Sequence, residues 1–216
     1  MRRSDPRSER ADTVETREKL LRSAVRVFAR HGFEGTGIRV VSADAGVNVA
    51  LVGYHFGNKE GIYREVVMQV CTLVQERLGA AMAVARNAMG VVDGEAAAEA
   101  ACRLLDPLID MVLEPGTTDL ARIMLHEQLD PGPGFDTFHQ ELTVPFVALL
   151  GELVARARRV PPSDEQRMSA LAIMGMLLIF KSAQSSSELM FGSDPWTGAC
   201  RQTLRSTITS AIGAVP

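Results

Sequence analysis

The chain has 216 residues, 46% hydrophobic and 5% aromatic, so it can bury a core and is too apolar to be disordered. Its three cysteines are widely spaced and form no C-x-x-C pair, which argues against a disulfide or zinc framework. The net charge of −3 hides an asymmetry: residues 1–66 carry twelve basic against nine acidic side chains, whereas residues 67–216 carry eleven against seventeen, so a polyanionic partner is expected at the N-terminal end only.

The sequence predicts no targeting or membrane segment. Its first twelve residues are polar and lack the apolar stretch of a secretory signal. The longest apolar run, residues 170–180, stops at Lys181 and is too short to cross a bilayer. We therefore expect a soluble, cytoplasmic protein with no membrane partner.

The N-terminal quarter is predicted to form an arm and three helices. Residues 1–12 are charged and are expected to be a flexible arm. Apolar residues at helical spacing then predict a helix from near Thr13 to Gly32. Thr36 caps a short second helix, and Gly46 ends it in a turn that requires positive φ. Asn48 caps the third helix.

The remaining residues are also predicted to be helical, with no competing strand pattern. Asn58 caps a long fourth helix, and later helices are separated by glycine- and proline-containing breaks. Pro107 and Pro145 are expected to bend the helices that contain them. The last two helices are predicted at 163–190 and 195–215, the first of them apolar nearly all round. The expected fold class is all-α, with about nine helices.

Residues 37–56 have the pattern of a helix-turn-helix, because a glycine turn joins two short helices that follow a longer one. Together with the string Tyr54 to Glu60, this stretch resembles the DNA-binding domain of the tetracycline-repressor (TetR) family. The matching residues are Phe28 to Phe33, Thr36, Ala45 to Asn48, Tyr54 to Phe56 and Asn58 to Glu60. The form Gly-Val-Asn-Val-Ala followed by Tyr-His-Phe-Gly-Asn-Lys-Glu-Gly is similar to a subgroup typified by CecR-type regulators.

The resemblance implies two domains and a set of DNA contacts. The DNA-binding domain would span residues 14–74, and a helical ligand-binding and dimerisation domain would span 75–216. The residues that the resemblance places on base edges are Asn48, Val49, Ala50 and Gly53. Those that it places on phosphates or the DNA backbone are Thr36, Arg39, Tyr54, His55 and Lys59. Because Val49 and Gly53 offer no side-chain hydrogen bond, we expect contact with thymine methyl groups and shape readout to carry more of the specificity.

In the resembling family the second domain holds a small-molecule pocket, so a small hydrophobic or amphipathic effector is expected. Methionine and phenylalanine side chains adapt to such ligands, although core packing is their usual role. The candidate pocket residues are Met111, Met124, His126, Phe138, Phe146, Met174 and Phe180.

The sequence thus predicts a homodimeric repressor that binds double-stranded DNA at a palindromic operator and is released by its effector. The last two helices are expected to form the dimer interface, and the long fourth helix to transmit the effector signal. The alternatives are an activator or ligand-independent regulator, and a small-molecule-binding protein without an operator. No motif of a hydrolase, nucleotide-binding loop or metalloprotease occurs, and His126 and His139 have no partner at metal-ligand spacing, so we expect no enzyme activity, cofactor or metal.

Overall fold

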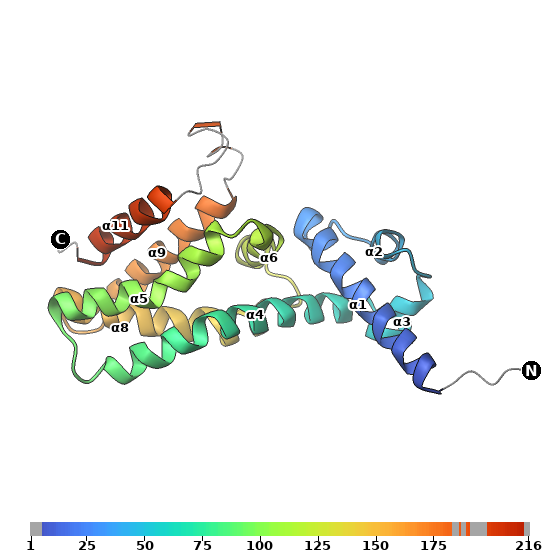
Figure 1. The fold of residues 1–216 in the computed structure, drawn as a ribbon, viewed down its shortest axis with the longest axis horizontal. Helices are drawn as coiled ribbons and strands as arrows, with labels where there is room; N and C mark the ends of the chain where they lie inside the picture. The colour runs from blue at the N-terminus through green and yellow to red at the C-terminus, as the bar shows by residue number, and fades with distance from the viewer. Residues whose placement is uncertain (1–5, 183–185, 187–188, 191–197, 214–216) are drawn as a thin grey trace, which may run out of the picture. The chain divides into compact units, whose positions relative to one another are not determined.

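The computed structural model describes residues 6–182, 186, 189–190 and 198–213. All regular structure in these ranges is helical, which confirms the all-α prediction (Figure 1). The chain divides into two compact units. Unit 1 comprises Met1–Val70 and Arg122–Phe138, and unit 2 comprises Cys71–Ala121 and His139–Pro216.

Unit 1 contains the three N-terminal helices that the sequence predicted. They are α1 (Pro6–His31), α2 (Ile38–Ala45) and α3 (Ala50–Phe56). Unit 1 also holds the first part of α4 (Lys59–Ala88), most of α6 (Thr118–Leu129) and α7 (Phe135–Phe138). Residues 122–138 were predicted to belong to the C-terminal domain, and they instead pack within the N-terminal unit.

The first helix begins at Pro6, so the predicted start near Thr13 is corrected, and so is the predicted arm over residues 6–12. Residues 1–5 of the predicted arm lie outside the described residues. Proline is favourable in the first turn of a helix, because its missing N–H would have no intrahelical partner there. Ion pairs one turn apart add support further along, between Glu15 and Lys19 (2.7 Å) and between Glu18 and Arg22 (3.5 Å).

The core of unit 1 is built where α1, α2, α3 and α4 face one another. Its largest fully buried side chains include Leu20, Phe28, Ile62 and Tyr63. The rings of Phe28 and Phe33 lie 4.8 and 4.9 Å from that of Tyr63, centroid to centroid. These aromatic contacts fix the end of α1 against the start of α4.

A buried serine and an ion pair fasten α2 to α1. The Ser23 hydroxyl is fully buried and lies 2.8 Å from the Val41 carbonyl oxygen and 2.7 Å from Asp44 Oδ2. Arg26 donates to the same carboxylate oxygen at 2.5 Å. The hydrogen bond from Ser23 and the Arg26 guanidinium hold the pKa of Asp44 below its usual value. Helix α2 ends at Gly46, whose φ of 67° confirms the predicted positive value.

Two glycines of unit 1 have opposite steric surroundings. A Cβ at Gly61, in the first turn of α4, would lie 1.9 Å from the Phe56 carbonyl oxygen, whereas a Cβ at Gly53, in α3, would meet nothing within 4 Å. We expect Gly61→Ala to lower the free energy of unfolding by about 2 kcal/mol, because backbone must shift to admit the methyl group. Gly53→Ala should raise it by up to about 1 kcal/mol, because alanine favours the helix. Urea denaturation of both variants checks the pair, and an equal effect of the two substitutions would contradict the assigned contacts.

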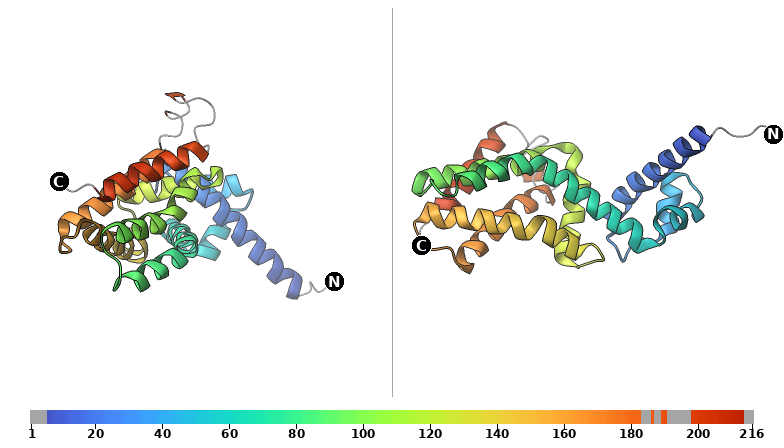
Figure 2. Two further views of the ribbon diagram at one scale, coloured as in Figure 1. Left: turned by 60° about the vertical axis from the view of Figure 1, so that its left-hand side comes forward. Right: turned by 90° about the horizontal axis from the view of Figure 1, so that it is seen from below.

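Unit 2 is a bundle of longer helices. They are the second part of α4, α5 (Gly94–Leu113), α8 (Val144–Arg158), α9 (Asp164–Ser182) and α11 (Gly198–Gly213), with the short 3-10 helix η1 (Pro115–Thr117). Helix α5 packs against α8 and α11, and α8 packs against α9 (Figures 1 and 2). The predicted start of the last helix near Pro195 lies outside the described residues. None of the described helices is long and apolar enough to cross a lipid bilayer.

The predicted bend at Pro145 is a change of helix type. A π-helical turn, His139–Thr143, separates α7 from α8, and Pro145 stands in the first turn of α8. Proline cannot donate a backbone hydrogen bond and its ring crowds the preceding turn, which accounts for the widened segment before it. The Thr143 hydroxyl in this turn is buried and has no hydrogen-bond partner among the described residues.

Arginine side chains attach α11 to the rest of unit 2. Arg205 donates to Asp106 Oδ1 at 3.0 Å, and Arg201 donates to Asp110 Oδ1 at 2.7 Å, so both bind carboxylates of α5. Arg158 of α8 donates to the carbonyl oxygens of Ile212 (3.1 Å) and Ala211 (2.9 Å). The two hydrogen bonds from Arg158 satisfy carbonyl oxygens at the C-terminal end of α11 that have no partner within the helix.

Candidate nucleic-acid interface

The second helix of the helix-turn-helix, α3, begins with an asparagine cap. Asn48 Oδ1 accepts a hydrogen bond from the Ala50 backbone N–H at 2.9 Å, as the sequence predicted. Val49 already has helical dihedral angles, φ −58° and ψ −29°. The cap uses only the oxygen of the Asn48 amide, so its Nδ2 group can donate to a partner outside the protein.

Helix α3 has one buried side and one open side. Val52 is fully buried, whereas Asn48, Ala50 and Gly53 are exposed. Val49 is 38% exposed. The small side chains and the open space above Gly53 leave this side flat enough for the helix backbone to approach another surface closely. All four predicted base-reading residues are thus exposed, and their role in reading bases stays a prediction.

An aromatic pair lies at the C-terminal end of that face. Tyr54 is 76% exposed, and its ring meets the half-buried ring of His55 edge to face with 5.0 Å between centroids. The guanidinium of Arg17 lies 5.1 Å from the centroid of the Phe56 ring and pairs with Glu65 at 2.6 Å. The Tyr54 hydroxyl and the His55 ring can thus contact a ligand at the C-terminal end of α3. The Phe56 ring is in contact with the Arg17 guanidinium.

Lys59 stands where α4 begins. Asn58 Oδ1 accepts from the Gly61 N–H at 2.8 Å, which confirms the predicted cap. The Lys59 ammonium lies 4.2 Å from the centroid of the Phe33 ring, a cation–π contact that restricts the side chain. A lysine beside the N–H groups of a helix N-terminus offers both a charge and backbone donors to an anion.

Of the two residues predicted to contact DNA beside α2, only Arg39 is exposed. Arg39 is exposed, and no ion pair involving it occurs among the described side chains. Thr36 is 2% exposed, and its hydroxyl donates to the Gly32 carbonyl oxygen at 2.8 Å. Its backbone N–H donates to the Phe33 carbonyl oxygen at 3.2 Å. Thr36 is therefore a structural residue of the turn, since both of its donors are used within the protein.

A buried carboxyl in unit 1 was missed by the sequence analysis. Glu127 of α6 is fully buried, and the Tyr63 hydroxyl donates a hydrogen bond to its Oε1. Its Oε2 has no partner within the described part of the chain. Burial raises the pKa of Glu127 above its usual value, although the hydrogen bond from Tyr63 opposes the shift. The residue stands in a helical sequence that gives no local signal of burial, because its partner Tyr63 is 64 positions away.

We expect the stability of the protein to fall as pH rises through the raised pKa of Glu127, because the fold favours the protonated carboxyl. Glu127→Gln should match the wild type at low pH and exceed it at neutral pH, by about 1.4 kcal/mol for each unit by which the folded pKa is raised. Denaturant unfolding between pH 4 and 8 checks this. Glu60→Gln, at an exposed position, is the control. Parallel curves for wild type and Glu127→Gln would show that the carboxyl ionises normally in the fold.

The seven predicted pocket residues are divided between the two units. Those in unit 1 are Met124, His126 and Phe138; those in unit 2 are Met111, Phe146, Met174 and Phe180. His126 Nε2 lies 3.3 Å from the Ala29 carbonyl oxygen, so this side chain contacts the end of α1. That these seven residues line one pocket stays a prediction. The four residues of unit 2 come from α5, α8 and α9, which pack on one another.

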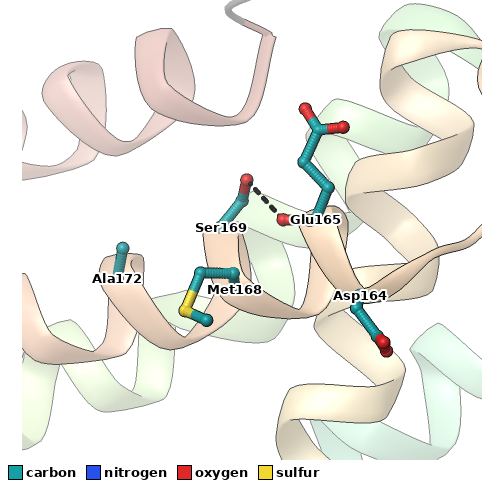
Figure 3. Close-up of a pocket in the computed structure, with 5 residues that line it drawn as sticks. All are labelled: Asp164, Glu165, Met168, Ser169 and Ala172. Carbon is teal, nitrogen blue, oxygen red and sulfur yellow. Dashed lines mark hydrogen bonds between the residues drawn. The ribbon is translucent and has the colours of Figure 1, made fainter.

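Two hollows of unit 2 have other linings. One, of about 460 Å³, lies between the end of α4 and α5 and is lined by alanines, Val84, Val92, Pro107, Arg103, Asp106 and Asp110. The other, of about 540 Å³, follows an open side of α9 (Figure 3) and is lined by Asp164, Glu165, Met168, Ser169 and Ala172. Neither includes a predicted pocket residue. No cluster of metal-ligating side chains occurs within the residues that the structure describes.

Comparisons with known proteins agree with this geometry. Residues 20–66 match the model of bacterial regulatory proteins of the tetR family. Residues 94–211, more than half of the chain, match the model of the C-terminal domain of the HTH-type transcriptional dual regulator CecR. CecR of Shigella flexneri is 24% identical over 204 residues, which cover 93% of this chain and 91% of that protein.

Two further relatives extend the likeness. The HTH-type transcriptional repressor NicS of Pseudomonas putida is 35% identical over 69 residues, covering 32% of each chain. The crystal structure of AibR in complex with isovaleryl coenzyme A and operator DNA superposes with a TM-score of 0.64 at 18% identity, covering 90% of this chain and 96% of that one. The chain belongs to the tetR family of bacterial transcriptional regulators and carries a C-terminal domain of the CecR type.

Proposed function

We propose that the protein is a dimeric repressor that binds a palindromic operator through α3 of each subunit and is released by a small hydrophobic or amphipathic effector bound in unit 2. The observation that carries the proposal is the open face of α3, which ends beside the capped N-terminus of α4 at Lys59. A flat helix face next to a cationic helix start suits a major groove and its flanking phosphate.

The DNA contacts divide into two sets. Asn48, Val49, Ala50 and Gly53 face base edges, with the Asn48 Nδ2 group as the main side-chain donor. The phosphate contacts come from Tyr54, His55, Lys59 and Arg39. Thr36 supports the turn from inside and is not among the contacts.

The dimer interface is proposed on α9 and α11. The exposed side of α9 carries large apolar residues at helical spacing: Met168 is 66% exposed, Leu171 41% and Ile179 59%. Met168 and Ala172 project from the same open stretch of the helix in Figure 3. Apolar side chains in such a row are usually covered by another chain.

The exposed side of α11 is suited to close helix packing. Its residues are small, and their hydroxyls donate to carbonyl oxygens one turn earlier, as Thr203 does to Ala199 (3.0 Å), Thr207 to Thr203 (2.9 Å) and Ser210 to Ser206 (3.0 Å). Because these donors are already satisfied, burying the face against a second copy removes few hydrogen bonds to water. Helices α9 and α11 of two subunits would then form a four-helix interface.

Release by an effector would use α4, which begins at Lys59 in unit 1 and continues to Ala88 in unit 2. An effector that favours the wrong spacing of the two α3 helices, about 34–36 Å in a binding dimer, would weaken operator affinity. Coupling of this kind typically amounts to about 1–3 kcal/mol. The structure of AibR holds both isovaleryl coenzyme A and operator DNA, which supports a small-molecule site and an operator site on one protein of this fold. The protein would act in the cytoplasm, where its DNA is.

Activation is the second candidate, because CecR is named a dual regulator. A selection from a random duplex DNA library with the purified full-length protein tests the proposal. We expect a palindromic consensus with half-sites one helical turn apart or a multiple of it. Recovery of no enriched sequence would contradict the proposal. A reporter gene downstream of the selected operator separates the candidates, since deletion of the regulator raises expression for a repressor and lowers it for an activator.

A further inference from the structure

Lys181, in the last turn of α9, is a buried cation. Its residue is 3% exposed. The chain contains three lysines among 23 basic side chains, and the other two, Lys19 and Lys59, lie in unit 1. Lysine is seldom fully buried unless it is paired, so the partner of Lys181 decides what the residue does.

The described partner of Lys181 is a neutral carbonyl. Its Nζ donates to the Glu114 carbonyl oxygen at 2.6 Å, which is the one hydrogen bond that the described residues give to its three donors. The carboxylate of Glu114 pairs with Arg77 at 2.7 Å, where both side chains are more than 40% exposed. Glu114 therefore supplies its backbone to Lys181, while its charge is directed to Arg77 and solvent.

The residues that flank Lys181 and its partner carbonyl along the chain are buried, and the Thr117 hydroxyl also lies 2.9 Å from the Glu114 carbonyl oxygen. Leu177, one turn earlier on α9, is 2% exposed, and Met111 at the end of α5 is 7% exposed. Thr117, 6% exposed, uses its hydroxyl to donate to the Met111 carbonyl oxygen. Burial lowers the pKa of Lys181, and the charge of Glu114 only partly offsets this. A buried ammonium whose described partner is a neutral carbonyl is stabilised by an anion that brings its own negative charge.

We propose that Lys181 binds the acidic group of the effector, and that the effector is an amphipathic carboxylate whose apolar part packs among the methionine and phenylalanine side chains of unit 2. This inference rests on the proposed effector-binding function of unit 2. The competing explanation is a purely structural lysine that ties α9 to the last carbonyls of α5. Only the first explanation expects the charge of Lys181 to change the affinity of the protein for an acid.

Sodium decanoate and 1-decanol serve as matched probes, because they share one chain and differ in the charged group. We expect calorimetry to show that Lys181→Met weakens decanoate binding about tenfold or more, as expected for loss of a charge-assisted hydrogen bond, and leaves decanol binding unchanged. Lys181→Arg should retain most of the preference for the acid. Lys19→Met, at an exposed position in unit 1, is the control and should change neither affinity.

A second readout follows the wild-type protein and uses a variant only to assign the signal. Lysine labelled with 13C at Cε gives three resonances in this chain, one of which disappears in Lys181→Arg and identifies Lys181. Saturating decanoate should raise the titration midpoint of that resonance and leave the other two unmoved. An unchanged midpoint, equal decanoate affinity of wild type and Lys181→Met, or no decanoate binding by the wild type would overturn the proposal. Operator binding without probe is measured separately, so that its loss would count against the repressor function and not against the anion site.

Discussion

Replacing Ile179 by glutamate is expected to convert the dimer into a monomer and to reduce operator affinity by about 100-fold or more. Ile179 is 59% exposed in the single chain, so a charged side chain there does not disturb the core of unit 2. In the proposed dimer the same position is covered by a second copy of α9, where an unpaired carboxylate is costly. A monomer engages one half-site at a time and loses the gain from bivalent binding, which typically amounts to about 10²–10⁴.

Analytical ultracentrifugation at micromolar concentration measures the first effect, and fluorescence anisotropy with the selected operator measures the second. Val84→Glu is the matched control, because Val84 is also in a helix of unit 2 and is 63% exposed, but lies on α4. It should leave both the mass and the affinity unchanged. If Ile179→Glu remained a dimer with wild-type affinity, the α9 face would not be the interface.

Lys59→Ala is expected to weaken binding to every duplex by the same factor, about tenfold for each subunit and about 100-fold for the dimer, as a charge-assisted hydrogen bond to phosphate is lost. The slope of log affinity against log salt should become shallower by about 1.8, since each of two lost phosphate contacts contributes about 0.9. The Phe33 ring that holds the Lys59 ammonium would keep its place.

Val49→Ala provides the contrasting variant. Val49 is 38% exposed on α3 and carries no charge, so its replacement should change which bases are preferred and leave the salt dependence intact. Anisotropy titrations at four salt concentrations, with the operator and with a scrambled duplex, distinguish the two variants. A Lys59→Ala protein that lost affinity for the operator alone would place Lys59 on a base and not on a phosphate.

The sequence predicted most reliably those features whose cause is local. Asn48 and Asn58 cap helices through N–H groups two or three residues away, and Gly46 takes the positive φ that its turn requires. The open face of α3 also followed from spacing, because Val52 alone among its central residues points into the core.

Features that depend on distant partners were not predictable in this way. The burial of Glu127 is set by Tyr63, and that of Lys181 by the carbonyl of Glu114, 67 positions earlier. Neither a glutamate nor a lysine in a helical sequence reveals such a partner. Thr36 is a different case, because its partner is local. It was assigned to DNA because its position matched the family pattern, but its hydroxyl donates to the Gly32 carbonyl oxygen, four positions earlier.

The grouping of residues 122–138 with unit 1 also depends on partners that are distant in the sequence. Their helical pattern is ordinary, and what joins them to unit 1 is contact with residues more than 60 positions away. His126 meets the Ala29 carbonyl, and a Cβ at Gly134 would lie 2.4 Å from a methyl carbon of Val67. Contacts between residues distant in the sequence therefore divide the chain differently from chain order, although the helices themselves were predicted.

In the proposed function, two copies of this chain read one DNA site through α3 and the start of α4. The most direct test is the affinity of the full-length protein for the selected operator and for a scrambled duplex of equal length at physiological salt, with the mass of the complex measured in the same sample. We predict a ratio of about 10³ or more and two chains on each operator. Equal affinity for the two duplexes, or a single chain on the operator, would contradict the account.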